Sequence, residues 1–357
     1  MSKFGVVFTI VVLMWVSVGV MAVFGQQSAA GSCEPTSYPL PGEFIVPESI
    51  TYDASTNMFY VGSAAQGTIF SGVVGEADSI EVFSPGGADG RIGALGMEVD
   101  TEGRLFVAGS RGGVIYVYDT ETAELIASFD TTEATGVAAN ETGFPHNLTD
   151  VAITPDGDVF VTDAFLPYLY RVYENDGGEL AMEVFIDFTD TIVEYQTPVP
   201  LNQIRSMEDN VSGFNINSIT ATPDGAYLLI GQTNTELLYR VTLEDRSIDP
   251  VDLGGELLHS DDLLLDGDLL YVNAIIDMAM GAETPTAIVI VRMNDDYTEG
   301  EVLSTYTNEL FKFQTSFVFV EGCLLATNSQ LPGFFTQQFE LPFDVVSVPI
   351  PTPEAGS

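Results

Sequence analysis

The stretch that decides the fold is LTDVAITPDGDVFVTD, which runs from Leu148 to Asp163. Two short apolar runs, VAI and VFV, lie on either side of the TPDG segment, and in related segments such as SITYD from Ser49 and SITAT from Ser218 apolar and polar residues alternate. Alternation with a period of two is typical of a half-buried strand, and a short Gly-containing segment between two such runs is typical of a hairpin turn. The stretch therefore predicts a β-hairpin.

The same pattern returns five more times along the chain. The other copies are SITYDASTNMFYVG from Ser49, GMEVDTEGRLFVAG from Gly96, SITATPDGAYLLIG from Ser218, DLLLDGDLLYVN from Asp262 and SFVFVEGCLLATN from Ser316. A further strand-like segment follows each copy, such as GVIYVYD, PYLYRVY or, after the last copy, PFDVVSVPI. Helical periodicity is nearly absent.

Six repeated antiparallel sheets predict an all-β fold, a six-bladed β-propeller with four strands in each blade. The propeller is expected to occupy residues 33–350 as a single domain. The alternatives are a seven-bladed propeller and a pair of β-sandwiches, but the chain holds no seventh copy. The segment SYPLPGEFIV, residues 37–46, is expected to supply the outer strand of the last blade and so to close the ring.

The two ends of the chain have a different character. Lys3 precedes an uninterrupted apolar run over residues 4–24, and the small and polar residues GQQSAAGS follow it. This order predicts a secretory signal peptide over residues 1–25, although the run is long enough to remain as a membrane anchor. Either reading places the rest of the chain outside the membrane, as a secreted, periplasmic or cell-surface protein. The Pro-rich residues 351–357 are expected to be a disordered tail.

The chain has two cysteines, Cys33 and Cys323. An exported protein can form a disulfide, and this one would tie the two ends of the propeller together. A lipid-modified Cys33 is the alternative, but the preceding AAGS lacks the usual large apolar residue.

The net charge is −42, with 52 acidic and 10 basic residues. Such a surface repels nucleic acids and anionic lipids, so neither is an expected partner. It attracts cations, which is also what a simple adaptation for solubility would do. We expect a monomer that binds a small molecule.

Equivalent positions of the repeats lie on one ring around a propeller axis. Counting back five residues from the turn of each copy gives Glu48, Leu95, Thr149, Asn217, Asp261 and Ser316. Glu48, Asn217 and Asp261 carry the oxygen ligands that calcium prefers, so the ring predicts a site for calcium or another divalent cation. Polar residues also cap strand ends in many β-proteins, which is the alternative reading.

Four further polar residues lie near the same mouth. Asp150 and Asp262 follow ring positions by one residue and would point the other way in a regular strand. His146 and His259 precede the inner strands of the third and fifth blades. A histidine there can act as a general base or a ligand, or make an ordinary loop hydrogen bond.

The motifs PESITYD at 47–53, NSITATPDG at 217–225 and SDDLLLDG at 260–267 resemble those of calcium-dependent propellers of the gluconolactonase and senescence-marker (regucalcin) group, an architecture shared with strictosidine synthase-like and NHL-like proteins. The resemblance implies that Glu48, Asn217 and Asp261 hold calcium. Thr149 stands where the group has a second asparagine, and Asn147 or Asp150 is the candidate substitute.

Two functions follow as expectations. The first is a secreted, calcium-dependent hydrolase with lactonase- or esterase-like activity, in which Asp261 is the general base or nucleophile and His146 or His259 assists proton transfer. The second is a non-catalytic extracellular propeller that binds a ligand or a protein over one face. A long interval between the third and fourth copies, residues 172–214, would suit such a contact surface.

Overall fold

The hairpin predicted from residues 148–163 forms strands β10 (Leu148–Ile153) and β11 (Val159–Asp163). Ile153 pairs with Val159 across the turn. Gly157 in the turn has a φ of +90°, a left-handed conformation that a side chain would strain, and its N–H donates to the carbonyl oxygen of Thr154 at 2.9 Å. The TPDG sequence therefore sets the register of this hairpin.

The computed structural model describes residues 1, 33–137, 146–198, 203, 208–209, 212–276, 286–336 and 338–353. The predicted signal peptide and the last four residues of the predicted tail lie outside these ranges. Residues Ser32–Ser357 form one unit by their internal contacts. No helix in the described ranges is long and apolar enough to cross a membrane.

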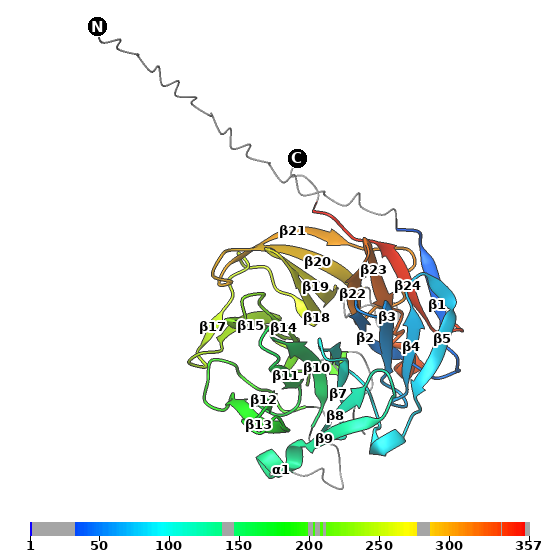
Figure 1. The fold of residues 1–357 in the computed structure, drawn as a ribbon, viewed down its shortest axis with the longest axis horizontal. Coiled ribbons are helices and arrows are strands. Elements are labelled where there is room, and N and C mark those ends of the chain that lie inside the picture. Colours follow the sequence, from blue (N-terminus) through cyan, green and yellow to red (C-terminus); the bar gives the residue numbers. More distant parts are fainter. Residues whose placement is uncertain are drawn as a thin grey trace. The chain divides into compact units, whose positions relative to one another are not determined.

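Six four-stranded antiparallel sheets make up the propeller in the described part of the chain, and they surround a common centre in Figure 1. The first blade consists of β2 (Pro47–Asp53), β3 (Met58–Ser63), β4 (Ile69–Val73) and β5 (Glu76–Ser84). The second consists of β6 (Met97–Val99), β7 (Arg104–Ala108), β8 (Val114–Asp119) and β9 (Leu125–Asp130). The third consists of β10, β11, β12 (Tyr168–Glu174) and β13 (Leu180–Asp187). The fourth and fifth blades are β14 (Ile216–Ala221), β15 (Tyr227–Gln232), β16 (Leu237–Thr242) and β17 (Ile248–Pro250); and β18 (His259–Asp266), β19 (Leu269–Ile275), β20 (Thr286–Met293) and β21 (Gly300–Tyr306). This confirms the predicted six-bladed fold.

The sixth blade joins the two ends of the propeller. It consists of β22 (Phe317–Val320), β23 (Cys323–Thr327), β24 (Asp344–Pro349) and, as its outer strand, β1 (Thr36–Pro39). In Figure 1 the blue β1 lies beside the red β24. The segment expected to close the ring therefore does so through its first residues.

The apolar core lies between the blades. Among the described residues, each of six apolar clusters combines side chains from two neighbouring sheets, and together the clusters run around the whole ring. Between the third and fourth blades, for example, Phe160 and Leu169 share a cluster with Ile216 and Leu228. Sheets packed face to face hold each other through side chains that interdigitate, so each blade depends on both neighbours.

Short helices lie outside the sheets. Helix α1 (Thr131–Thr135) follows β9, and α3 (Gly333–Thr336) lies between β23 and β24. Asp130 caps α1, because its carboxylate accepts a hydrogen bond from the N–H of Thr132 at 2.8 Å.

The predicted disulfide is present. Cys33 lies three residues before β1, and Cys323 is the first residue of β23. Their Cα atoms are 5.2 Å apart, and 290 residues separate them in the sequence. The bond therefore fastens the segment just before β1 to β23 of the sixth blade, which closes the ring.

Replacing both cysteines with serine should lower the free energy of unfolding by about 2–5 kcal/mol, because a cross-link over a long loop restricts the unfolded chain. Urea denaturation of the wild type and of Cys33→Ser/Cys323→Ser measures this difference. Reductant should shift the wild-type midpoint to that of the variant and leave the variant unchanged. A variant as stable as the oxidised wild type would show that β1 closes the ring without the bond.

Candidate functional site

The inner strands of four blades contain β-bulges at the predicted ring. In β2, β14 and β18 the pairing with the neighbouring strand skips one residue, and the skipped residues are Glu48, Asn217 and Asp261. In β10 the register shifts between Leu148 and Val151. A bulge places an extra residue in one strand and re-aims its side chain. The ring is thus built from residues that have left the regular ladder.

The bulges also change the direction of the next residue. Asp150 and Asp262 were expected to point away from the ring, but that expectation assumed regular strands. The carboxylate of Asp150 accepts from the N–H of Ile219 on the fourth blade at 2.8 Å. That of Asp262 accepts from the N–H of Phe317 on the sixth blade at 3.1 Å. Both side chains therefore reach across the central channel wall to another blade.

Hydroxyl groups also make bonds between neighbouring blades. Ser316 accepts from the N–H of Ile50 at 3.2 Å, and so ties the sixth blade to the first. Thr149 donates to the carbonyl oxygen of Asn217 at 3.0 Å, and Thr315 donates to that of Glu48 at 2.6 Å. Backbone groups that the bulges leave without a ladder partner thus find one on the adjacent blade.

A glycine permits the close approach of two blades at this level. A Cβ atom on Gly96 would lie 2.4 Å from the Cα of Asp150 and 2.6 Å from the carbonyl oxygen of Thr149. Any side chain there would push the second blade away from the bulge of the third. The ring residue before it, Leu95, is buried and contributes no polar atom.

A cavity of about 180 Å³ lies on the axis, because residues from all six inner strands line it. Its acidic wall residues are Glu98, Asp150 and Asp262. The negative charges of Asp150, Asp261 and Asp262 all raise the pKa of Glu48, after the larger effect of burial, which places these carboxyl groups near one another. Five carboxyl groups thus converge at the centre of the propeller.

The environment favours the neutral form of these acids. Burial raises the pKa of Glu98 and of Asp261 to about 7, and that of Asp262 to about 6. The pKa values of Glu48 and Asp150 are also well above the ordinary range, first because of burial and then because of neighbouring carboxylates. Within the described ranges, none of the five has an ion pair with a basic side chain.

Two of the three predicted metal ligands contact each other directly. The amide nitrogen of Asn217 donates to a carboxylate oxygen of Asp261 at 2.8 Å. Glu48 lies close enough to Asp261 for their charges to interact. No cluster of three or more acidic, histidine or cysteine side chains in the described ranges has the arrangement of a metal site. The predicted ligands Glu48, Asn217 and Asp261 would supply two carboxylates and one amide, a chemistry that suits a hard cation.

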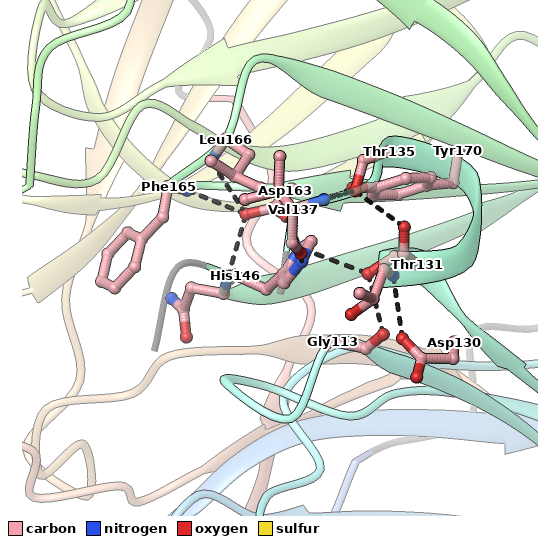
Figure 2. A network of polar contacts seen from close by, with 12 residues as sticks. Gly113, Asp130, Thr131, Thr135, Val137, His146, Asp163, Phe165, Leu166 and Tyr170 are labelled. Atoms are coloured by element: carbon pink, nitrogen blue, oxygen red, sulfur yellow. Dashed lines mark hydrogen bonds and ion pairs between the residues drawn. The ribbon is translucent and has the colours of Figure 1, made fainter. Parts of the chain in front are cut away.

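The predicted histidine His146 is buried in a polar network on the third blade, shown in Figure 2. Its Nδ1 lies 2.9 Å from a carboxylate oxygen of Asp163, and its Nε2 lies 2.8 Å from the carbonyl oxygen of Val137. Both of these neighbours can accept a hydrogen bond from the ring, and the hydroxyl of Thr131 also lies 3.2 Å from Nδ1. Burial lowers the pKa of His146, but the hydrogen bond and charge of Asp163 outweigh it and raise the pKa.

The other oxygen of Asp163 organises the start of the blade. It accepts from the N–H groups of Asn147, Phe165 and Leu166 at 2.9, 3.0 and 3.1 Å. The side chain of Asn147 is buried, and its amide nitrogen has no hydrogen-bond partner. Asn147 therefore lies beside the His146 network.

The second predicted histidine, His259, begins β18. Its Nδ1 lies 2.8 Å from the carbonyl oxygen of Thr233, and its Nε2 lies 2.7 Å from a carboxylate oxygen of Glu236. All four ring nitrogens of the two histidines are thus engaged with protein atoms.

The repeat analysis selects one position in each copy, so it leaves out Glu98, and it expects the side chain of Asp262 to point away from the ring. Glu98 is the second residue of β6, and its carboxylate accepts from the hydroxyl of Thr51 at 3.2 Å. It lies three residues beyond its blade's ring position, so a search at a single repeat position does not find it. Comparing every inward position of the six copies would have found it.

The chelator-treated protein should lose stability as the pH rises from 5 to 8. The folded-state pKa values of Glu98 and Asp261 lie above their unfolded values, so their protonated forms stabilise the fold and this contribution disappears as the pH passes about 7. Glu98→Gln and Asp261→Asn should each reduce the pH dependence by about 1–3 kcal/mol. Denaturation at several pH values measures it, and Asp266→Asn, an exposed position on the same strand, is the control. Equal pH dependence in all variants would contradict the assignment.

No protein-family model and no curated protein matches the chain. Solved structures do match it. The chain is similar to the major allergen Mala s 1 of Malassezia sympodialis, with a TM-score of 0.60, 15% identity, and coverage of 87% of this chain and 95% of that one. It is also similar to the calcium-binding protein regucalcin of Agrobacterium tumefaciens, with a TM-score of 0.54, 14% identity and coverage of 86% and 90%. Virginiamycin B lyase of Staphylococcus aureus gives a TM-score of 0.54, 10% identity and coverage of 89% and 100%. At these identities the likeness is one of fold, which a calcium-binding protein and a lyase share with this chain.

Proposed function

We propose that the protein is an exported, divalent-cation-dependent hydrolase of lactones or esters, with its active site at the mouth of the central channel. The observation that carries the proposal is the set of bulges that take Glu48, Asn217 and Asp261 out of their strand ladders. No basic side chain in the described ranges forms an ion pair with either acid. The similarity to a calcium-binding propeller supports the choice of cation. The disulfide and the apolar run at residues 4–24 support export.

The residues present suit a divalent cation. Glu48 and Asp261 supply carboxylate oxygens, and the amide of Asn217 supplies a neutral oxygen while its nitrogen holds Asp261 in place. Further negative charge from Asp150 and Asp262 lies behind them. Calcium bound there would polarise the carbonyl oxygen of an ester or lactone.

Asp261 is the candidate general base of the proposal. It would take a proton from the attacking water as the water oxygen bonds to the acyl carbon, and return the proton to the alkoxy oxygen as the acyl–oxygen bond breaks. Its pKa of about 7 belongs to the metal-free protein, and a bound cation would lower it, so Asp261 would be ionised and able to accept a proton at neutral pH. Because both histidines are engaged elsewhere, the proposal gives neither of them a proton-transfer role.

Asp261→Asn should lower kcat at least 100-fold on a substrate found in a panel of lactones and esters with calcium present, because a carboxamide cannot accept the proton. Asn217→Ala and Glu48→Gln should instead raise the calcium concentration needed for half-maximal activity. Asp266→Asn, far from the ring on the same strand, is the matched control. Absence of any calcium-dependent turnover in the wild type would contradict the hydrolase and favour the non-catalytic binding propeller.

Calcium binding should release protons near pH 7, because the ligand Asp261 and the nearby Asp262 have raised pKa values in the free protein. The affinity should therefore rise from pH 6 to pH 8 and level off above it. Calorimetry in buffers of different ionisation enthalpy measures the number of protons released. An affinity that does not change over this range would place the bound calcium away from these acids.

A further inference from the structure

Arg111 differs from the other basic residues that the structure describes. Among the basic side chains that the structure describes, all but Arg111 donate a hydrogen bond or form an ion pair. Burial lowers the pKa of Arg111, and no carboxylate of the described residues opposes the shift. The chain has 52 acidic residues, yet Arg111 forms an ion pair with none of those that the structure describes.

Arg111 lies in the tight turn between β7 and β8, and it is only partly buried. Its guanidinium carbon is 5.7 Å from the centre of the Phe165 ring, which in turn meets Phe214 edge-on at 5.5 Å. An aromatic face attracts the guanidinium and leaves its N–H groups free to donate outward. Arg111 thus presents five donors beside an aromatic surface.

The backbone places this turn on the same rim as the ring residues. The carbonyl oxygen of Ser110 accepts from the N–H of Leu148 at 3.1 Å, and Leu148 precedes Thr149 of the ring. The carbonyl oxygen of Ala164, next to Phe165, accepts from the N–H of Asn215, which lies two residues before Asn217. The turn of Arg111 and the segment of Phe165 therefore lie at the same end of the inner strands as the ring residues, next to the starts of β10 and β14.

The network of Figure 2 includes Phe165 and also Gly113, which lies in the same turn as Arg111. The carbonyl oxygen of Gly113 accepts from the N–H and the hydroxyl of Thr131, both at 2.8 Å. A Cβ on Gly113 would lie 2.9 Å from the His146 ring, so the turn rests directly on that ring. Asp163 holds His146 on one side and the N–H of Phe165 on the other. Asp163 thus holds the segment of Phe165 directly and orients the His146 ring, on which the turn that carries Arg111 rests.

The turn also contains strained backbone. Ser110 has a φ of +59°, in the left-handed region that costs a non-glycine residue about 1 kcal/mol or more. Two hydrogen bonds hold this conformation in place: the carbonyl oxygen of Gly113 accepts from the N–H of Thr131, and that of Ser110 accepts from the N–H of Leu148. Strained, well-anchored residues are typical of sites where a side chain must be held ready for a ligand.

We propose that Arg111 forms an oxoanion subsite at the rim of the channel mouth, where it holds a carboxylate or phosphate group of the small molecule that the mouth accepts. A planar guanidinium matches the two oxygens of either group and binds them through paired hydrogen bonds. The acidic surface of the protein repels free anions, whereas the guanidinium of Arg111 can donate hydrogen bonds to an anionic group. The subsite rests on the proposed function for the identity of its ligand as a substrate, but anion binding itself is measurable without turnover.

The binding test titrates the calcium-loaded protein with succinate and with inorganic phosphate by calorimetry at 0.15 M salt. The wild type should bind at least one of the two near a 1:1 ratio, and the better ligand identifies the group. Arg111→Gln should weaken this binding at least tenfold, and Arg111→Lys should weaken it less, because lysine keeps the charge but loses the paired geometry. Arg292→Gln, which removes a half-exposed arginine near Asp268, should bind as the wild type does.

The proposal is overturned if neither anion binds the wild type. It is also overturned if Arg111→Gln has a lower melting temperature but binds the anion as tightly as the wild type does, because Arg111 would then only pack over Phe165. Esters that differ only by a terminal carboxylate separate this outcome from failure of the hydrolase. Turnover of neutral esters without anion binding would refute the subsite alone. Anion binding that Arg111→Gln abolishes, without turnover of any ester, would support the subsite and refute the hydrolase alone.

Discussion

The structure depends on how the innermost strands satisfy their backbone groups where the bulges interrupt the ladder. Each bulge frees N–H and carbonyl groups, and side chains of the neighbouring blade bind them. Asp150 and Asp262 accept from the fourth and sixth blades, and Thr149 donates to the fourth. An unpaired buried backbone group would cost about 1–3 kcal/mol, so these bonds tie the ring together at its narrowest point. They also bring acidic side chains to the axis.

Convergence of these acids has an electrostatic consequence. Glu48 meets the charges of three other carboxyl groups, and no basic residue of the described chain pairs with any of the five. Carboxyl groups that lie close together in a partly buried channel either bind protons, which makes them neutral, or bind a cation, which balances their charge. The raised pKa values of Glu98 and Asp261 correspond to the first condition, and the proposed calcium site to the second. The bonds that hold the blades together at the channel and the candidate cation site thus both arise from the bulges of the inner strands.

Much of this architecture follows from the sequence. The six hairpins, the closing strand and the Cys33–Cys323 bond are all predicted from the repeat and the cysteine positions. The directions of Asp150 and Asp262 were not, because a period-2 pattern assumes a regular strand and a bulge shifts the register. The partners of His146 were also beyond prediction, since Asp163 and Val137 meet it only through tertiary contacts.

The most direct test of this account is anomalous diffraction from crystals grown with manganese or a lanthanide in place of calcium. The account predicts one dominant peak at the channel mouth, within ligand distance of Glu48, Asn217 and Asp261, and loss of that peak in Asp261→Asn crystals. Peaks scattered over the acidic outer surface, with none on the axis, would contradict it. The ring acids would then serve only to hold the blades together.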